Sequence, residues 1–316
     1  MVDEEDSKTN SKMNGFLKFK SLRHPCFNLG TTTAFKEFIP NDVELGKDVA
    51  QLGLLTGANA AGKSTVLRMT CIAVIMAQMG CYVPCDSAIL TPVDRIMTRL
   101  GANDNIMQGK STFFVELSET KKILDLATNS SLLVLDELGR GGSSSDGFAI
   151  AEGVLHHVAT HIQSLGFFAT HYATLGNGFN GHPQVRPLKM SILVDEQTRN
   201  VTFLYKLLEG RSEGSFGMHV ASMCGIPKEI VDIAEIAAEN REHTSRLLKE
   251  RKKAAEELDD DTDILPLGLE SDFVRLVYGD GLTNTKLGTG EDVQVYDWNI
   301  KQNVFKSLFT MIKALE

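Results

Sequence analysis

A short apolar segment runs directly into a glycine-bracketed loop and then into an apolar helical pattern. LGLLTG (Leu52 to Gly57) has the composition of a buried strand, GANAAGKST (57 to 65) forms the turn, and KSTVLRMTCIAVIMAQ continues as a helix. The loop satisfies G-x-x-x-x-G-K-[ST] between a strand and a helix, which is the context in which this pattern indicates phosphate binding. The sequence therefore predicts a P-loop nucleotide site in an α/β domain.

Residues of this loop have separate expected roles. The backbone N–H groups and the positive end of the following helix face the phosphates. Lys63 is expected to reach the outer phosphates, and Ser64 is expected to bind Mg²⁺. The predicted nucleotide-binding loop consists of Gly57, Ala58, Asn59, Ala60, Ala61, Gly62, Lys63, Ser64 and Thr65.

Further along the chain, strand and helix patterns alternate. SLLVLDE (131 to 137) and GFFATH (166 to 171) are short apolar strands, preceded by the helical stretches STFFVELSETKKILDLAT and DGFAIAEGVLHHVATHI. This alternation predicts a mostly parallel sheet covered by helices on both faces. A hairpin turning near Asp195 to Asn200 is expected to add antiparallel strands beside it.

Four parts of the chain are expected from these patterns. Residues 1–14 are a polar start, and residues 15–210 are the α/β domain. Residues 211–258 predict two helices, broken at Gly225-Ile226-Pro227, that form a helical interaction appendage. Residues 259–316 contain an acidic linker and a tail ending in a helix from Trp298 to Leu315.

Two acidic residues and a histidine end the predicted strands. Asp136 is the expected Mg²⁺ partner, because α/β sheets place ligands at the carboxyl ends of their strands. Glu137 is expected to orient or deprotonate the attacking water, and His171 is expected to contact the γ-phosphate. Asp136 to Gly139 also fits the D-x-x-G of a GTPase, but no N-K-x-D motif follows, so the substrate is predicted to be ATP with Mg²⁺.

Other residues with metal-like spacing are interpreted as ordinary ones. Cys81 and Cys85 are spaced like zinc ligands, but no second Cys or His pair lies near them in the sequence, so packing is favoured. His157 and His161, at i and i+4, are interpreted as surface or packing residues. The five cysteines are expected to be reduced thiols.

Composition and charge limit the partners and the location of the chain. The net charge of −9 argues against a strongly basic nucleic-acid surface. No uninterrupted apolar run reaches the roughly 18 residues of a membrane span. The acidic opening MVDEEDSKTNSKMNG does not have the pattern of a secretory signal, so the cytosol or nucleus is expected.

Taken in order, six stretches carry a family resemblance: FLKFKSLRHPCF, GANAAGKST, AQMGCYVPC, DRIMTRLGANDNIMQGKSTFFVE, LDELGRGGSSSDG and FATHY. With them the chain resembles the C-terminal ATPase region of the MutS mismatch-repair proteins, and within that family the large subunits of eukaryotic MutSα heterodimers. The likeness runs from about Gly15 to Arg246, and more loosely to the end.

The resemblance implies an ABC-type P-loop NTPase and assigns further site residues. It matches Phe38 and Ile39 to an adenine-packing pair, Gln78 to the glutamine loop, Ser111 to a signature serine acting in trans, His171 to the switch histidine, and Asn59 to the loop asparagine near the γ-phosphate. The chain departs from the family where most members have Pro-Asn-Met-Gly, since it has Ala58-Asn59-Ala60-Ala61. Gly142 also replaces a usual threonine.

The resemblance also implies partners. They are a related MutS-family small subunit in a heterodimer formed through the helical appendage, mismatched DNA bound through domains absent here, and a MutL-type repair factor, with the nucleus as the location and no membrane. The family's Phe-x-Glu mismatch wedge has two look-alikes, Phe35-Lys36-Glu37 and Phe114-Val115-Glu116, but both fall inside the ATPase region. The chain is therefore expected to be a fragment without the mismatch-binding, connector, lever and clamp parts.

Two alternative functions remain open from the sequence. A transporter-type ABC subunit should carry L-S-G-G-Q where this chain has IMQGKSTF (106 to 113). A nucleotide-dependent heterodimerisation module with little turnover is suggested by Ala60-Ala61.

Overall fold

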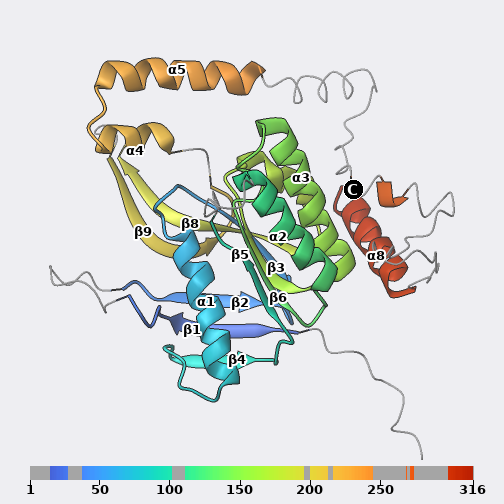
Figure 1. Ribbon diagram of the computed structural model, residues 1–316. Coiled ribbons are helices and arrows are strands. Elements are labelled where there is room, and N and C mark those ends of the chain that lie inside the picture. Colours follow the sequence, from blue (N-terminus) through green and yellow to red (C-terminus); the bar gives the residue numbers. More distant parts are fainter. Residues whose placement is uncertain are drawn as a thin grey trace, which may run out of the picture.

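The computed structural model describes residues 15–27, 38–101, 111–195, 200–212, 216–244, 268, 271–273 and 298–315. These residues form a mixed α/β arrangement built on two sheets (Figure 1). The polar start, residues 102–110, the wedge look-alike at 35–37, the hairpin turn at 196–199 and the acidic run at 259–263 lie outside the described residues.

The larger sheet has six strands in the order β5-β6-β7-β3-β8-β9. Five of them run parallel, and the last pairs antiparallel with its neighbour. In this order the strands are β5 (Ile96–Arg99), β6 (Leu132–Asp136), β7 (Leu165–Ala169), β3 (Leu52–Thr56), β8 (Val185–Asp195) and β9 (Asn200–Glu209). The predicted mostly parallel sheet with an antiparallel hairpin at one edge is confirmed.

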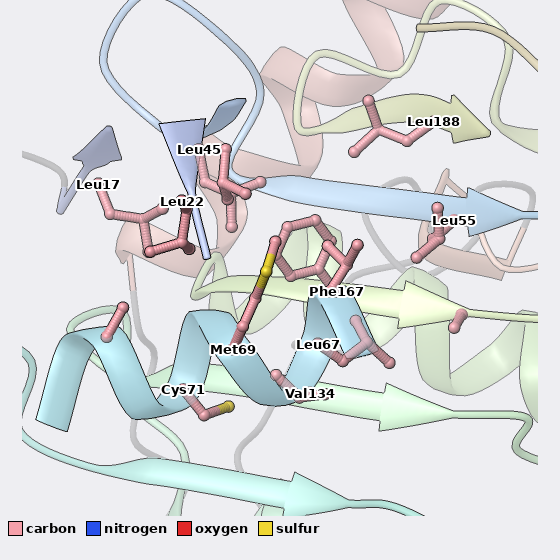
Figure 2. Close-up of a cluster of buried hydrophobic side chains, with 14 of the residues drawn as sticks. Leu17, Leu22, Leu45, Leu55, Leu67, Met69, Cys71, Val134, Phe167 and Leu188 are labelled. Carbon is pink, nitrogen blue, oxygen red and sulfur yellow. The ribbon is translucent and has the colours of Figure 1, made fainter. Parts of the chain in front are cut away.

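Helices cover both faces of this sheet. Alternate residues of a strand point to opposite faces, so Leu55 of β3 joins a core cluster with α1 (Lys63–Gln78), while Leu54 joins a second cluster with α2 (Thr112–Leu126) and α3 (Ser144–His156). Figure 2 shows the first cluster, in which Met69 of α1 lies beside Phe167 of β7. Burial on both faces explains why every residue of β3, β6 and β7 is buried.

A second, smaller sheet is antiparallel and has the order β2-β1-β4. It consists of β1 (Leu17–Leu22), β2 (Asn41–Leu45) and β4 (Ser87–Leu90). Its inner side chains, including Leu17 and Phe19, belong to the same core cluster as α1. The sequence patterns above did not predict this sheet. Arg23, just after β1, donates to the carbonyl of Phe38, just before β2.

After α3 the chain does not continue as the regular helix expected from the sequence. Residues His157–Ile162 form a π-helix, η2, which ends with an N–H···O bond from Gln163 to Val158. Beyond β7, residues Ala173–Phe179 form a short 3₁₀ helix, η3.

In the C-terminal third, the helices α4 (Gly217–Met223), α5 (Lys228–Thr244) and α8 (Trp298–Leu315) follow, and residues 268 and 271–273 are helical as well. The predicted break at Gly225-Ile226-Pro227 separates α4 from α5, and the predicted final helix is confirmed. α8 packs against η2 and buries Val304, Leu308 and Met311. No helix among the described residues is both long and apolar enough to cross a membrane.

All five cysteines are free. Cys71 is buried on α1, where desolvation raises the pKa of its thiol to about 12. Cys81 is exposed and Cys85 half-buried, and neither belongs to the group of possible metal ligands found among the described residues.

Candidate nucleotide site

Three neighbouring strands of the large sheet bring the predicted phosphate-site residues to one edge. β6, β7 and β3 lie side by side in parallel, so their carboxyl ends meet there. The loop at 57–62 follows β3, Glu137 follows β6, and His171 comes two residues after β7. This juxtaposition is what the alternation of apolar strands and helices predicts.

The backbone of the loop depends on left-handed conformations. Gly62, the residue before α1, has φ 98°, and a Cβ there would lie 3.3 Å from the Tyr205 ring. Glycine suits this position because it adopts positive φ without steric penalty. Ala60 has φ 68°, a conformation that costs an L-residue about 1 kcal/mol or more. Ala60 therefore lies in a strained backbone position.

Lys63 is buried and turned back onto its own loop. Its Nζ donates to the carbonyl oxygen of Gly57 at 2.7 Å and to that of Ala58 at 3.3 Å. Nζ also lies 3.8 Å from Oε1 of Glu137. Desolvation lowers the pKa of this ammonium, and the nearby carboxylates oppose the shift. The Lys63 ammonium is therefore buried inside the loop, where the carbonyls of Gly57 and Ala58 hold it.

Ser64 and Asp136, the two predicted Mg²⁺ ligands, are in direct contact. The Ser64 hydroxyl donates to Oδ2 of Asp136 at 2.8 Å, although the residues are 72 positions apart. Burial raises the pKa of the Asp136 carboxyl, an effect that the Ser64 hydrogen bond opposes. The other oxygen, Oδ1, is buried and has no hydrogen-bond partner among the described groups. A hydroxyl and a carboxylate with one unused buried oxygen fit the oxygen ligands that Mg²⁺ prefers.

Glu137 lies between two cations. Its Oε2 accepts a hydrogen bond from Arg140 at 2.7 Å, and its Oε1 faces Lys63. Its backbone has φ 54°, and its N–H donates to the carbonyl of Ala169 at the end of β7. A sparsely populated backbone conformation held by the neighbouring strand is a feature that clusters at functional sites.

His171 is exposed and its ring contacts that of Tyr172, with 4.0 Å between the centroids. Desolvation lowers the pKa of the imidazole, and the charge of Glu137 opposes this shift. The Tyr172 hydroxyl in turn donates to the carbonyl of Gly139. The residues after β7 are therefore tied to the loop after β6.

Sequence reasoning missed a buried ion pair that supports this loop. Glu116 of α2 accepts a hydrogen bond from the backbone N–H of Gly139, and its other oxygen lies 3.1 Å from Arg99 of β5. Both side chains are almost fully buried. In the sequence Glu116 stands out only as part of a wedge look-alike. Its partner Gly139 lies 23 residues later, and no local pattern links the two.

Phe38 and Ile39 lie before β2 and are linked to the loop through Tyr205. The Asn41 amide donates to the carbonyls of Ile39 and Tyr205, and the Tyr205 ring lies close to Gly62. Phe38 is half-buried and Ile39 is 40% exposed. An apolar pair beside the phosphate loop therefore faces partly toward solvent, and Tyr205 joins it as a residue that sequence reasoning missed.

Gln78 is not brought to the phosphate loop. It ends α1, about 22 Å along the helix axis from Lys63 at a rise of 1.5 Å per residue. Its side-chain amide is bonded on both sides to the backbone of Val93. The amide therefore holds the segment before β5 against the end of α1.

Three other predicted residues have simpler surroundings. Asn59 is exposed and Thr65 half-buried. Ser111 caps α2, because its hydroxyl accepts the N–H of Phe114 at 3.2 Å. Ser111 is exposed at the start of α2. The residues just before it lie outside the described part of the chain.

Comparison with known proteins agrees with the motifs. A family model described as MutS domain V matches residues 53–242. The chain is 79% identical to the DNA mismatch repair protein MSH6 of Saccharomyces cerevisiae over 316 residues, which cover all of this chain and 25% of that protein. It is 41% identical to human DNA mismatch repair protein Msh6 over 74% of this chain and 18% of the relative.

A bacterial relative, the DNA mismatch repair protein MutS of Caldicellulosiruptor bescii, is 40% identical over 80% of this chain and 30% of its own length. The chain thus spans about a quarter of the yeast protein and less than a third of the others. The resemblance inferred from the ordered motifs is confirmed: the chain belongs to the MutS family of DNA mismatch repair proteins.

Proposed function

We propose that this chain is the ATP-binding and ATP-hydrolysing module of a mismatch-repair MutS homologue, with an ABC-type P-loop fold. The observation that carries the proposal is the convergence of Lys63, the Ser64–Asp136 pair and Glu137 at the carboxyl ends of β3 and β6, the parallel strands on either side of β7. Ligands bind at this edge in open α/β sheets.

Mg²⁺ would be held by Ser64 and Asp136, and it would neutralise charge that develops on the phosphates during transfer. The support is the unused buried oxygen of Asp136. A bound cation would also remove the desolvation cost that raises the pKa of this carboxyl.

The reaction is in-line attack of water on the γ-phosphate of ATP, which breaks the bond to the β–γ bridging oxygen and releases ADP and phosphate. Lys63 exchanges its two loop carbonyls for phosphate oxygens, where a charge-assisted donor in a dry site is most effective. Glu137 positions the water and accepts its proton, and Arg140 keeps that carboxylate oriented. His171 and Asn59 contact the γ-phosphate, while Phe38 and Ile39 pack on the adenine.

The remaining features of the proposal follow the family. Residues 15–210 form the ATPase domain, residues 211–258 the dimerisation appendage, and residues 259–316 the linker and tail. Two nucleotide sites form between this chain and a related small subunit, with Ser111 facing the partner's nucleotide. In the nucleus, the ATP state controls clamping on mismatched DNA by domains outside this chain and contact with a MutL-type factor.

Two substitutions test the chemistry at this site. Lys63→Met should weaken ATP binding, and Glu137→Gln should keep binding but slow single-turnover hydrolysis by about 10²-fold or more, as expected for loss of a general base. Both variants are measured with a fluorescent ATP analogue and in rapid-quench assays, with and without the partner subunit. Lys121→Met, on the exposed side of α2, is the control. Hydrolysis at the parent rate by Glu137→Gln would refute the assignment.

A second candidate function is a nucleotide-dependent heterodimerisation module with little turnover. Ala60-Ala61 suggests it, because Ala61 stands where most members have glycine, and a loop with less backbone freedom can bind phosphates without aligning them for attack. ATP-dependent assembly with the partner, together with equally slow hydrolysis by the parent chain and Glu137→Gln, would identify this function. A transporter subunit is not supported, since the chain belongs to the MutS family.

A further inference from the structure

A second cluster of ionisable side chains lies away from the nucleotide site. His156 ends α3, about 18 Å along the helix axis from its first residue Ser144. Nε2 of His156 and Nε2 of His161 lie 2.8 Å and 2.9 Å from the same oxygen, Oδ2 of Asp272. Asp272 comes from the segment 271–273, more than a hundred residues later.

The π-helix explains why these two histidines meet. In a regular α-helix, residues five apart are rotated by about 140° around the axis. Hydrogen bonds in a π-helix join residues five apart, so the wider turns of η2, which begins directly after His156, bring His156 and His161 to one side, with 5.6 Å between the ring centroids. Such interruptions of an α-helix occur frequently at functional sites. The i, i+4 pair His157 and His161, which the sequence highlights, is therefore not the pair that shares a ligand-like partner.

The cluster buries the negative charge of the Asp272 carboxylate. The side chain of Asp272 is 4% exposed and that of His156 is 7% exposed. Burying a carboxylate is costly unless a cation or several hydrogen bonds balance it. The ion pairs of Asp272 within the described residues run to the two imidazoles, which are neutral unless protonated. A cation among these three groups would balance the charge.

Gly268, four residues before Asp272, lies against His156 at the end of α3. A Cβ at Gly268 would lie 2.6 Å from the His156 ring, so only glycine permits this approach. The helix α8 also packs on η2 (Figure 1). The cluster thus joins the C-terminal part of the chain to the end of α3.

We propose that His156, His161 and Asp272 form a zinc site that fastens the C-terminal segment to the ATPase domain. Their ligand atoms all lie within 4.8 Å of one another. Two imidazoles and one carboxylate are a frequent zinc donor set, with water in the fourth tetrahedral position. Zinc at its usual bond lengths sets neighbouring donors about 3.3 Å apart, so a small widening of the present N···O distances admits the ion.

The surroundings of His156 suit a metal ligand. Its Nδ1 lies 3.3 Å from the Thr160 hydroxyl, which is in turn 3.1 Å from Nε2 of His182. With Nε2 on zinc, the Nδ1–H group donates to Thr160, which is the outer contact that orients metal-bound imidazoles. His161 is the most exposed of the three side chains and provides the open side for water. Mg²⁺ prefers oxygen ligands, so this site is chemically separate from the nucleotide site.

The test uses the untagged full chain, stripped with a chelator and supplied with Zn²⁺ in the presence of excess Mg²⁺ and without nucleotide. We expect about one zinc per chain by elemental analysis after gel filtration, and the visible absorption of tetrahedral cobalt when Co²⁺ replaces zinc. His161→Asn and Asp272→Asn should weaken zinc binding by at least about tenfold. His157→Asn, on the same π-helix but without a bond to Asp272, should bind zinc like the parent chain.

The unfolding temperature is a second measurement, which distinguishes loss of zinc binding from loss of folding. Zinc should raise the unfolding temperature of the parent chain and of His157→Asn, but not that of His161→Asn or Asp272→Asn. Failure of the folded parent chain to retain zinc would overturn the proposal, as would equal retention by all four proteins. The cluster would then be a hydrogen-bonded carboxylate with two imidazoles.

Discussion

The carboxylate of Glu116 accepts a hydrogen bond from the backbone N–H of Gly139 and pairs through its other oxygen with Arg99. Glu116 belongs to α2, whose first turn is capped by Ser111, and Gly139 belongs to the loop that carries Glu137. The helix expected to face the partner's nucleotide is thus bonded to the loop expected to position water for this chain's own nucleotide. A displacement of α2 would move this loop directly.

Glu116→Ala should destabilise the chain and slow hydrolysis. The substitution leaves the buried Arg99 without this partner, and breaking a buried pair in this way typically costs about 3–5 kcal/mol. Glu116→Gln retains an acceptor for Gly139, so its hydrolysis should fall less than that of Glu116→Ala. Urea unfolding and single-turnover assays measure both effects.

The control for this prediction is Glu119→Gln, because Glu119 is half-exposed on the same helix and also approaches Arg99. It should change the free energy of unfolding by less than about 1 kcal/mol. If Glu116→Ala and Glu119→Gln hydrolysed ATP at equal rates, the bond between Glu116 and Gly139 would have no role in catalysis.

Gly142 stands where the family usually has threonine, and the structure gives a packing reason. A Cβ at Gly142 would lie 3.0 Å from the ring of Phe113. Gly142→Thr should therefore destabilise the chain by about 1–3 kcal/mol through overpacking. Shortening the neighbour in Phe113→Leu should remove most of that penalty. A double-mutant cycle by urea unfolding measures the coupling, and additive effects of the two substitutions would show that the contact is unimportant.

Two of the three alanines of the phosphate loop, Ala60 and Ala61, should respond oppositely to glycine. Ala60 has φ 68°, so Ala60→Gly should relieve strain and raise the free energy of unfolding by about 0.5–1 kcal/mol. Ala61 is buried and outside the positive-φ positions, so Ala61→Gly should lower it by a similar amount. Thermal and urea unfolding of both variants check the signs. Destabilisation by both substitutions would argue against strain at Ala60.

The sequence predicted those parts of the fold in which local pattern and burial agree. β3, β6 and β7 are continuous apolar runs because helices cover both faces of the sheet. The helix after the phosphate loop and the break at Gly225-Ile226-Pro227 also carry local signals. For the same reason, Lys63 and Glu137 could be assigned to one edge before their contacts were known.

The small antiparallel sheet was missed because its strands lack the continuous apolar runs of β3, β6 and β7 and because its pairing is long-range. Leu17 pairs with Leu45 on one side and with Leu90 on the other, and β4 is mostly exposed. The π-helix has no local signal either, since it changes which histidines share a face without changing composition. Asp272, their partner, lies more than a hundred residues later, so no local pattern links it to them.

The last prediction separates two roles of Ser111. Its hydroxyl caps α2 in this chain, and the family likeness assigns it to the γ-phosphate bound by the partner. Ser111→Asp keeps an acceptor for the Phe114 N–H, so stability should hold, whereas Ser111→Ala should lose about 1 kcal/mol with the cap. Both substitutions should slow hydrolysis at the partner's loop, and the aspartate more strongly, because its charge repels the phosphate. Each variant is mixed with the partner subunit, and nucleotide crosslinking with single-turnover assays reports the two sites separately. Slower hydrolysis with Ser111→Ala but not with Ser111→Asp would mean that the cap alone matters. Equal loss at both sites would argue against a composite site.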